Sequence, residues 1–375
     1  SEMCIRDSFN SMLNYSSRTV CQGFLMITLS DRASGRDNNL NLIRMIAASA
    51  VLVSHAYPIA SGAGTPEPLK ALTGETLGTL AVYTFFTISG FLIAASFMRA
   101  PTLERFLAAR TLRLFPGLIV SLVLVAFVMG PLVTTLPVAT YLTHPDTWTF
   151  MLRNTALALP QYTLPGVFET NPYPTVEGSI WTLIHEVLCY TGLFVAGVAG
   201  LLKRRTAMTV LISAFVAVWM LVPALGVELH PKVDDLRRLA LPFAVRTAFY
   251  LWQHRIGLSL LGVAGLTALA WALKDTAFHT PALVTALGYA VFWIAYVPGG
   301  AIRQYNLVGD YSYGIYIYAF PLQGLAVWWA GPMTPLENML WSFPISLICA
   351  IASWHLVENP ALKLLSRHRH HLQKT

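Results

Sequence analysis

Apolar segments of about 20 residues, separated by short polar connections, recur along almost the whole chain. At 1.5 Å of rise per helical residue, each segment is long enough to cross the ~30 Å hydrocarbon layer of a bilayer. We predict about ten transmembrane helices from this pattern. They lie near residues 40–60, 75–98, 116–135, 180–201, 207–225, 239–253, 257–273, 281–298, 307–330 and 338–357. The expected fold is therefore an all-α, polytopic membrane bundle.

The same pattern divides the chain into three parts. Residues 1–36 form a polar extension that we expect to be disordered or not native, with Met26 as a candidate initiator. Residues 37–365 form one transmembrane domain, and residues 366–375 form a basic cytoplasmic tail. A cleaved signal peptide is the alternative interpretation of the first apolar segment. Arg44 and His55 within it, and the many segments that follow, favour a retained helix.

Composition and charge agree with a membrane protein and set its orientation. Hydrophobic residues make up 55% of the chain and charged residues 11%, against about 25% charged in soluble domains. The net charge of +7 comes from short basic clusters between apolar segments, a pattern typical of loops that face anionic lipid rather than of nucleic-acid binding. With a cytoplasmic N-terminus, the inner connections hold more Lys and Arg than the outer ones. We therefore expect a multi-pass membrane protein with both termini in the cytoplasm.

Cysteine and histidine usage predicts neither a disulfide framework nor a metal site. The four cysteines are scattered, and Cys189 and Cys349 fall inside apolar segments, where a thiol usually behaves as a small buried hydrophobe.

The first apolar segment carries two ionisable residues, Arg44 and His55. Their separation of eleven residues is close to three helical turns, so both side chains share one face, ~16 Å apart along the axis. Ionisable groups at membrane depth are expected to face the bundle interior or a water-filled cavity. A neutral imidazole there is suited to take a proton from an attacking hydroxyl, or to carry an acyl group itself. The alternative is a hydrogen-bonding role within the bundle.

Two further motifs lie on the next two predicted helices. The sequence FFTISGFL (85–92) contains the small pair Ser89-Gly90, which lets another helix or a thin ligand approach the backbone closely. The sequence LERFLAARTLRLFP (103–116) places Arg110 and Arg113 three residues apart on one helical face. Two guanidinium groups on one face suit phosphate oxygens, although the spacing alone favours anchoring at the cytoplasmic surface.

A long connection, residues 136–179, lies on the predicted outer face. It contains six prolines and the aromatic residues Tyr141, Trp148, Tyr162, Phe168 and Tyr173. Loops of this length without secondary structure are usually functional. The aromatic rings suit stacking on sugars, and an aromatic belt at the membrane interface is the alternative.

Taken in order, these motifs resemble the acyltransferase-3 family of membrane O-acyltransferases, over most of residues 37–365. The segment from Asn39 through Arg44 to His55 is similar to the opening Arg-x10-His helix of the family, FFTISGFL to its second-helix signature, and Arg110-Thr111-Leu112-Arg113 to its Arg-x-x-Arg motif. Three later segments also resemble family motifs: Gly178–Leu183 with Glu186, Asp310–Tyr316, and Val357–Pro360.

The resemblance implies roles for individual residues. His55 is the expected catalytic histidine, supported by Glu186, and Arg44, Arg110, Arg113 and Ser89 are expected to bind the donor. His185 points roughly 100° away from Glu186 on the same helix, so we expect it to be structural. Two features depart from the family pattern. Ala319 stands where members commonly carry a histidine, and Arg246 in a short apolar segment is unexpected, with a carboxylate, donor phosphate or lipid headgroups as its candidate partners.

The resemblance implies a protein of the bacterial inner (plasma) membrane that transfers an acyl group, in its simplest form acetyl, from acyl-CoA to a hydroxyl of a carbohydrate or glycolipid acceptor. We expect no permanently bound cofactor, no nucleic-acid partner, and the lipid bilayer as surroundings; the oligomeric state is open. The first alternative is a transporter in which His55, Glu186 and the intramembrane arginines form a proton or solute pathway. A non-catalytic sensor or scaffold is the second.

Overall fold

The computed structural model describes residues 28–33, 35, 37–99 and 102–364. These residues fold into helices, and their β-structure is limited to one isolated antiparallel bridge between Thr28 and Gly257. The all-α prediction is confirmed. Most of the predicted extension 1–36 and the whole predicted tail 366–375 lie outside the described residues.

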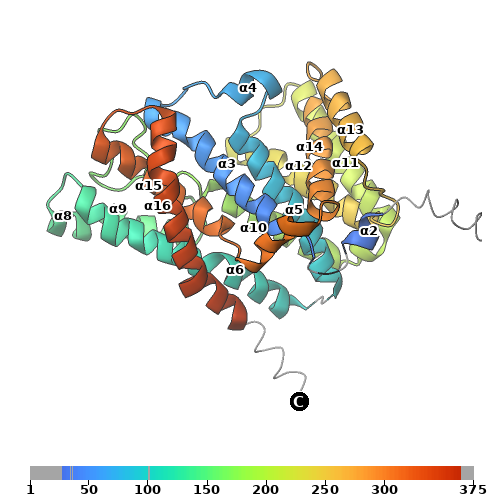
Figure 1. Cartoon of the computed structure of the whole chain (residues 1–375), viewed down its shortest axis with the longest axis horizontal. Helices are drawn as coiled ribbons and strands as arrows, with labels where there is room; N and C mark the ends of the chain where they lie inside the picture. The colour runs from blue at the N-terminus through green and yellow to red at the C-terminus, as the bar shows by residue number, and fades with distance from the viewer. Residues whose placement is uncertain (1–27, 34, 36, 100–101, 365–375) are drawn as a thin grey trace, which may run out of the picture.

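Each of the ten predicted apolar segments coincides with a helix (Figure 1). The long helices are α3 (Leu40–Ser61), α5 (Leu77–Arg99), α6 (Leu103–Leu124), α10 (Trp181–Val198), α11 (Arg205–Ala224), α12 (Pro231–Leu251), α13 (Leu260–Ala272), α14 (His279–Tyr296), α15 (Ser312–Ala330) and α16 (Pro335–Ser353). π-Helical turns continue two of them: η1 (Val125–Met129) leads from α6 into α7 (Gly130–Val133), and η4 (Trp354–Glu358) follows α16. The short helices are α2 (Leu29–Arg32), α4 (Pro68–Thr73), α8 (Val138–Thr143), α9 (Pro145–Thr155), η2 (Leu201–Lys203) and η3 (Gly300–Leu307).

Six of the described helices are long and apolar enough to cross a membrane, fewer than the ten predicted. They are Leu40–Ser61, Leu77–Arg99, Phe106–Val133, Trp181–Val198, Arg205–Ala224 and Pro335–Leu364. The bent pair α14 and η3, which meet at 90°, would make a seventh. Helix α12 carries several charged residues, α13 is only 13 residues long, and polar and tyrosine side chains interrupt α15. A count of about ten spans is therefore not confirmed.

Helix α5 lies at the centre of the bundle and packs against α3, α10, α12 and α14, while α15 packs against α3 and α16 (Figure 1). The close approach predicted at Ser89-Gly90 is confirmed. A Cβ added to Gly90 would lie 2.3 Å from the carbonyl oxygen of Phe243 in α12, so only glycine allows α5 and α12 to pack this closely.

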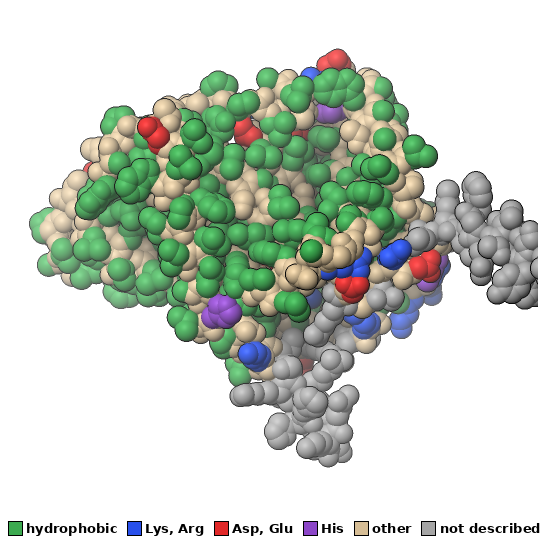
Figure 2. Space-filling model, viewed as in Figure 1, with side chains coloured by type: hydrophobic (Ala, Val, Ile, Leu, Met, Phe, Trp, Pro, Cys, Tyr) green, Lys and Arg blue, Asp and Glu red, His purple; other side chains and the backbone are tan. Residues whose placement is uncertain are grey.

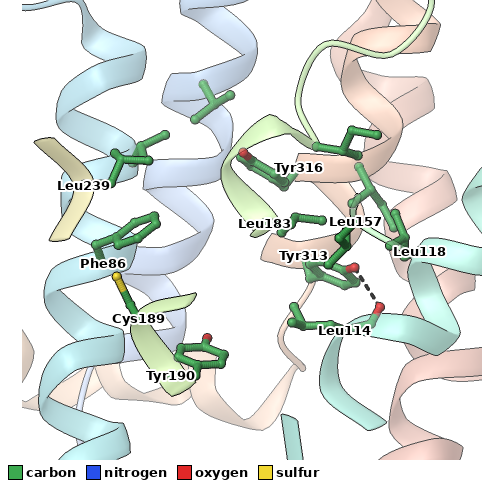
Figure 3. Close-up of a cluster of buried hydrophobic side chains, with 14 of the residues drawn as sticks. Phe86, Leu114, Leu118, Leu157, Leu183, Cys189, Tyr190, Leu239, Tyr313 and Tyr316 are labelled. Atoms are coloured by element: carbon green, nitrogen blue, oxygen red, sulfur yellow. Dashed lines mark hydrogen bonds between the residues drawn. The ribbon is translucent and has the colours of Figure 1, made fainter. Parts of the chain in front are cut away.

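Aromatic side chains connect the helices in the interior (Figure 3). Tyr313 of α15 donates its hydroxyl hydrogen to the carbonyl oxygen of Leu114 in α6, at 2.7 Å. Phe86 of α5 and Tyr190 of α10 lie on the other side of the same view. Since a buried tyrosine hydroxyl needs a partner, the Tyr313 bond fixes α15 against α6.

The long connection at 136–179 is more ordered than the sequence predicts. It contains α8 and α9, and three of its six aromatic residues, Tyr141, Phe150 and Phe168, belong to the core. Tyr141 is buried and donates to the carbonyl oxygen of Ala126 at 2.7 Å, and Phe168 is 1% exposed. Trp148 and Tyr162 remain exposed. Only part of the predicted sugar-stacking set is therefore accessible.

Candidate active site

A cavity of about 300 Å³ opens among α3, α5, α6, α10 and α15. We call it the donor cavity, because it collects every predicted donor-binding residue. Its polar lining consists of Arg44, Ser89, Ser96, Arg99, Arg110, Arg113, Thr182, Glu186, Tyr190, Ser312, Tyr313 and Tyr316. Apolar side chains, among them Phe85 and Phe86, complete the wall.

Four guanidinium groups meet in the donor cavity. Arg44, Arg110 and Arg113 were predicted from the sequence, and Arg99 was not. Arg99 follows Ser89 by ten residues, which leaves the two side chains about 80° apart around α5, so helical periodicity did not link Arg99 to the site. Guanidinium groups that converge in this way suit a polyanion such as a phosphate-bearing ligand.

A carboxylate that the sequence linked only loosely to the site joins two of these arginines. Oδ2 of Asp310, between η3 and α15, accepts a hydrogen bond from Arg44 at 3.0 Å and one from Arg113 at 2.5 Å. Oδ1 accepts from Ser312. Burial acts to raise the pKa of Asp310, but the two guanidinium groups outweigh burial and lower this pKa to about 2. The pair Arg44 and Arg113 is thus held by one ionised carboxylate.

Arg110 differs from Arg44 and Arg113 because no carboxylate in the described chain bonds to it, and the same holds for Arg99. The guanidinium of Arg110 lies over the rings of Tyr190, at 5.6 Å, and Phe106, at 5.9 Å. Its buried Nε has no hydrogen-bond partner among the described residues. This arginine therefore has hydrogen-bonding capacity left for a ligand.

Glu186 also lies in the donor cavity. Its Oε1 accepts hydrogen bonds from Ser89 Oγ, at 3.1 Å, and from the hydroxyl of Tyr190. The structure does not bring Glu186 to His55, so the orienting contact suggested by the sequence is not formed. The two ring nitrogens of His185 lie 3.0 Å and 3.3 Å from the carbonyl oxygens of Trp181 and Lys232, and the nitrogen that carries hydrogen donates to its carbonyl, consistent with a structural role.

His55 lies in a second cavity of about 330 Å³, which we call the histidine cavity. The cavity is lined by Val51, Ser54, His55, Thr76, Gly78, Thr79, Val82, Tyr83, Trp181, Asp235, Arg238, Leu239 and Tyr316. The imidazole packs edge-on against Phe320, with ring centroids 5.1 Å apart, and forms no hydrogen bond with another described residue. Both ring nitrogens are therefore available to a substrate.

The two cavities meet at Val82 and Tyr316, which line both. The Tyr316 hydroxyl donates to the carbonyl oxygen of Ser179 at 2.6 Å and lies 2.5 Å from Thr182 Oγ1. These bonds hold the tyrosine ring as a partition between the arginines and His55. The predicted site residues are thus divided between two adjoining chambers rather than gathered in one.

Among the described residues, no carboxylate pairs with Arg246. It is fully buried, donates to the carbonyl oxygens of Val284 and Thr285 in α14, and lies 3.8 Å over the ring of Phe249. Carbonyl groups and an aromatic ring replace the expected carboxylate, phosphate or headgroup, because α12 and α14 pack closely enough to enclose the side chain. We interpret Arg246 as a structural link between these helices.

Comparisons with known proteins show to which family the chain belongs. The profile of a family described as an acyltransferase domain matches residues 37–358. The chain is 31% identical over 339 residues to a protein named O-acetyl transferase from Shigella phage Sf6, covering 86% of this chain and 95% of that protein. It is 27% identical over 369 residues to Nodulation protein 10 of Rhizobium leguminosarum bv. viciae, covering 89% and 96%. No solved structure matches the chain. With the family motifs in place on an all-helical membrane fold, the chain belongs to the acyltransferase-3 family of multi-pass membrane proteins and is an O-acyltransferase.

Proposed function

We propose that this protein transfers an acyl group, in its simplest form acetyl, from acyl-CoA to a hydroxyl of a carbohydrate-containing acceptor. The observation that carries the proposal is the contact between an arginine-lined cavity and a histidine-lined cavity through Val82 and Tyr316. The name of the phage relative supports acetyl as the transferred group. Family membership favours an acyltransferase over the transporter and scaffold alternatives.

The donor cavity is suited to acyl-CoA. Arg110 and Arg99, which bond to no carboxylate in the described chain, would bind the CoA phosphates first, and Arg44 and Arg113 would follow as the phosphates compete with Asp310. The pantetheine arm, which is thin and mostly apolar, would then extend along the wall that includes Phe85 and Phe86 toward Tyr316. Ser89 lines this path.

The reaction proposed at His55 is transfer of the acyl group from the thioester to the acceptor hydroxyl. The acceptor hydroxyl oxygen attacks the thioester carbonyl carbon, a C–O bond forms, and the C–S bond to CoA breaks. His55 takes the hydroxyl proton as the attack proceeds and returns it to the CoA thiolate. Formation of an acyl-imidazole, which the acceptor hydroxyl then cleaves, uses the same residue and the same atoms. In both routes the thioester must pass Val82 and Tyr316, so these side chains have to separate during transfer.

We propose that Arg44 and the arginine pair lie at the cytoplasmic surface of a bacterial inner membrane. Most of the Lys and Arg side chains visible in Figure 2 gather near its lower edge, below a broad band of hydrophobic side chains. This distribution supports a cytoplasmic lower edge. A domain of residues 37–365 with about ten membrane helices and both termini inside would place the histidine cavity toward the outer face.

The proposal is tested with purified protein in nanodiscs and radiolabelled acetyl-CoA. We expect transfer or slow hydrolysis of the donor, and a loss of about 10²–10⁴-fold in His55→Ala, the contribution typical of a general base. His254→Ala is the matched control, because His254 is exposed and lines neither cavity. If the His55→Ala variant reacted at the wild-type rate, His55 would have no catalytic role. Failure of acetyl-CoA to bind or react would reject the donor.

A further inference from the structure

We propose that the histidine cavity binds one neutral sugar ring of the acceptor, and that Asp235, Arg238 and Trp181 determine which ring is accepted. This inference rests on the proposed function and adds a binding site and a substrate class to it. The three residues come from two helices: Asp235 and Arg238 from α12, and Trp181 from the first turn of α10.

The lining of the histidine cavity has the chemistry that a sugar ring requires. Besides His55 it presents the hydroxyl groups of Ser54, Thr76, Thr79 and Tyr83. Trp181 adds a flat apolar face, against which the C–H face of a sugar ring can pack. The volume of about 330 Å³ lies at the small end of the range for small-molecule pockets, about 300–1,000 Å³, which suits one ring better than a chain segment.

Asp235 is the residue that most directly indicates a ligand. Its side chain is partly buried and forms no hydrogen bond or ion pair with any other described residue. The preceding residue, Asp234, is paired with Arg237 at 2.7 Å. Consecutive helical residues point about 100° apart, so α12 directs Asp234 to a protein partner and Asp235 into the cavity. A partly desolvated carboxylate without a donor is unfavourable, and the hydroxyl groups of a sugar would supply the missing hydrogen bonds.

The charges around the cavity favour a neutral ring over an anionic one. Arg238 lies three residues after Asp235, on the same face of α12. Its guanidinium is 3.4 Å from Glu75, so its positive charge is already shared with a carboxylate. Ser54 donates to a further carboxylate, Glu67, at 2.6 Å. With Arg238 balanced by Glu75, Asp235 leaves the cavity net negative, which repels the carboxylate of a uronic acid or a phosphorylated sugar.

Two amphiphilic probes that differ in one group test the inference, namely octyl glucoside and octyl glucuronide. Each is added to the protein in nanodiscs below its micellar concentration, with radiolabelled acetyl-CoA, and acetyl transfer to the glycoside is measured beside acetyl-CoA hydrolysis. We expect the wild-type protein to acetylate the glucoside at least ten-fold more efficiently than the glucuronide. In Asp235→Ala, kcat/KM for the glucoside should fall at least ten-fold, while hydrolysis and the KM for acetyl-CoA stay unchanged.

Further variants separate a binding role from a structural one. Asp235→Asn keeps the shape and part of the hydrogen-bonding capacity of the side chain, so it should retain more glucoside acetylation than Asp235→Ala. Because the variant lacks the negative charge, its ratio of glucoside to glucuronide acetylation should be lower than that of the wild type. Asp234→Ala is the matched control, because that carboxylate does not line the cavity. Three outcomes would contradict the sugar site without contradicting the donor reaction. They are equal acetylation of both glycosides, acetylation of neither glycoside while acetyl-CoA hydrolysis continues, and unchanged glucoside acetylation in Asp235→Ala. Absence of both hydrolysis and acetyl-CoA binding would instead reject the proposed function itself.

Discussion

Replacing Asp310 with asparagine tests the charge balance of the donor cavity. Its Oδ2 holds Arg44 at 3.0 Å and Arg113 at 2.5 Å, and asparagine keeps the shape while removing the charge. Removing one partner of a buried ion pair typically costs about 3–5 kcal/mol. The side chains of Arg44 and Arg113 are 23% and 21% exposed, so water compensates part of the loss. We therefore expect the free energy of unfolding to fall by about 3 kcal/mol.

Thermal unfolding in nanodiscs, with and without CoA, measures this effect. In a chain of this length, each kcal/mol lost from the free energy of unfolding lowers Tm by no more than about 2 °C. Asp310→Asn should therefore lower Tm by up to about 6 °C in the absence of CoA. The CoA phosphates should then bind the released guanidinium groups without a competing carboxylate, so Kd for CoA should fall below that of the wild type. CoA stabilises both proteins, so at saturating CoA the gap in the free energy of unfolding narrows by the difference in binding free energy, about 1.4 kcal/mol for each ten-fold decrease in Kd.

Two controls accompany the measurement. Asp275→Asn changes an exposed aspartate away from both cavities and should leave Tm unchanged. Because the pKa of Asp310 is lowered to about 2, its stabilisation is complete above the unfolded value of about 3.9 and is lost only as the pH falls toward 2. The difference in Tm should therefore be constant between pH 5 and 9. An unchanged Tm in Asp310→Asn, or a deficit that CoA does not reduce, would refute the competition between carboxylate and phosphates.

Two further predictions concern groups outside the proposed chemistry. Burial raises the pKa of Glu177, which bonds to Ser179, to about 7, so its contribution to stability is present below about pH 4.3 and is lost as the pH rises through 7. Glu177→Gln should flatten Tm between pH 5 and 8 and raise it at pH 8; an unaltered pH profile would contradict this. Gly288→Ala would place a Cβ about 2 Å from the buried guanidinium of Arg246 and should lower Tm, whereas Gly265→Ala, with open space around it, should not. Equal Tm values for the two alanine variants would contradict the close packing.

Helical periodicity predicted well what lies along one helix. The three-residue spacing of Arg110 and Arg113 placed both in one cavity, and the small pair at Ser89 marked a close helix contact. Helical periodicity could not predict the contacts between helices. Asp310 meets Arg44 across 266 positions, and a local pattern cannot reveal how two helices are rotated against each other. For the same reason the sequence assigned Glu186 to the support of His55, whereas the structure places it with the arginines.

The division of the site into two chambers follows from a distance that the sequence already contained. Arg44 and His55 share one face of α3 but lie eleven residues apart, so ~16 Å of helix separates the group suited to phosphate from the group suited to acyl transfer. A small substrate cannot contact both. CoA has its phosphates at one end and its thioester at the far end of the pantetheine arm, so a single donor molecule can reach both residues. If acyl-CoA is the donor, as proposed, its length would join the two cavities into one reaction site, and its thioester would have to cross at Tyr316, which lines both.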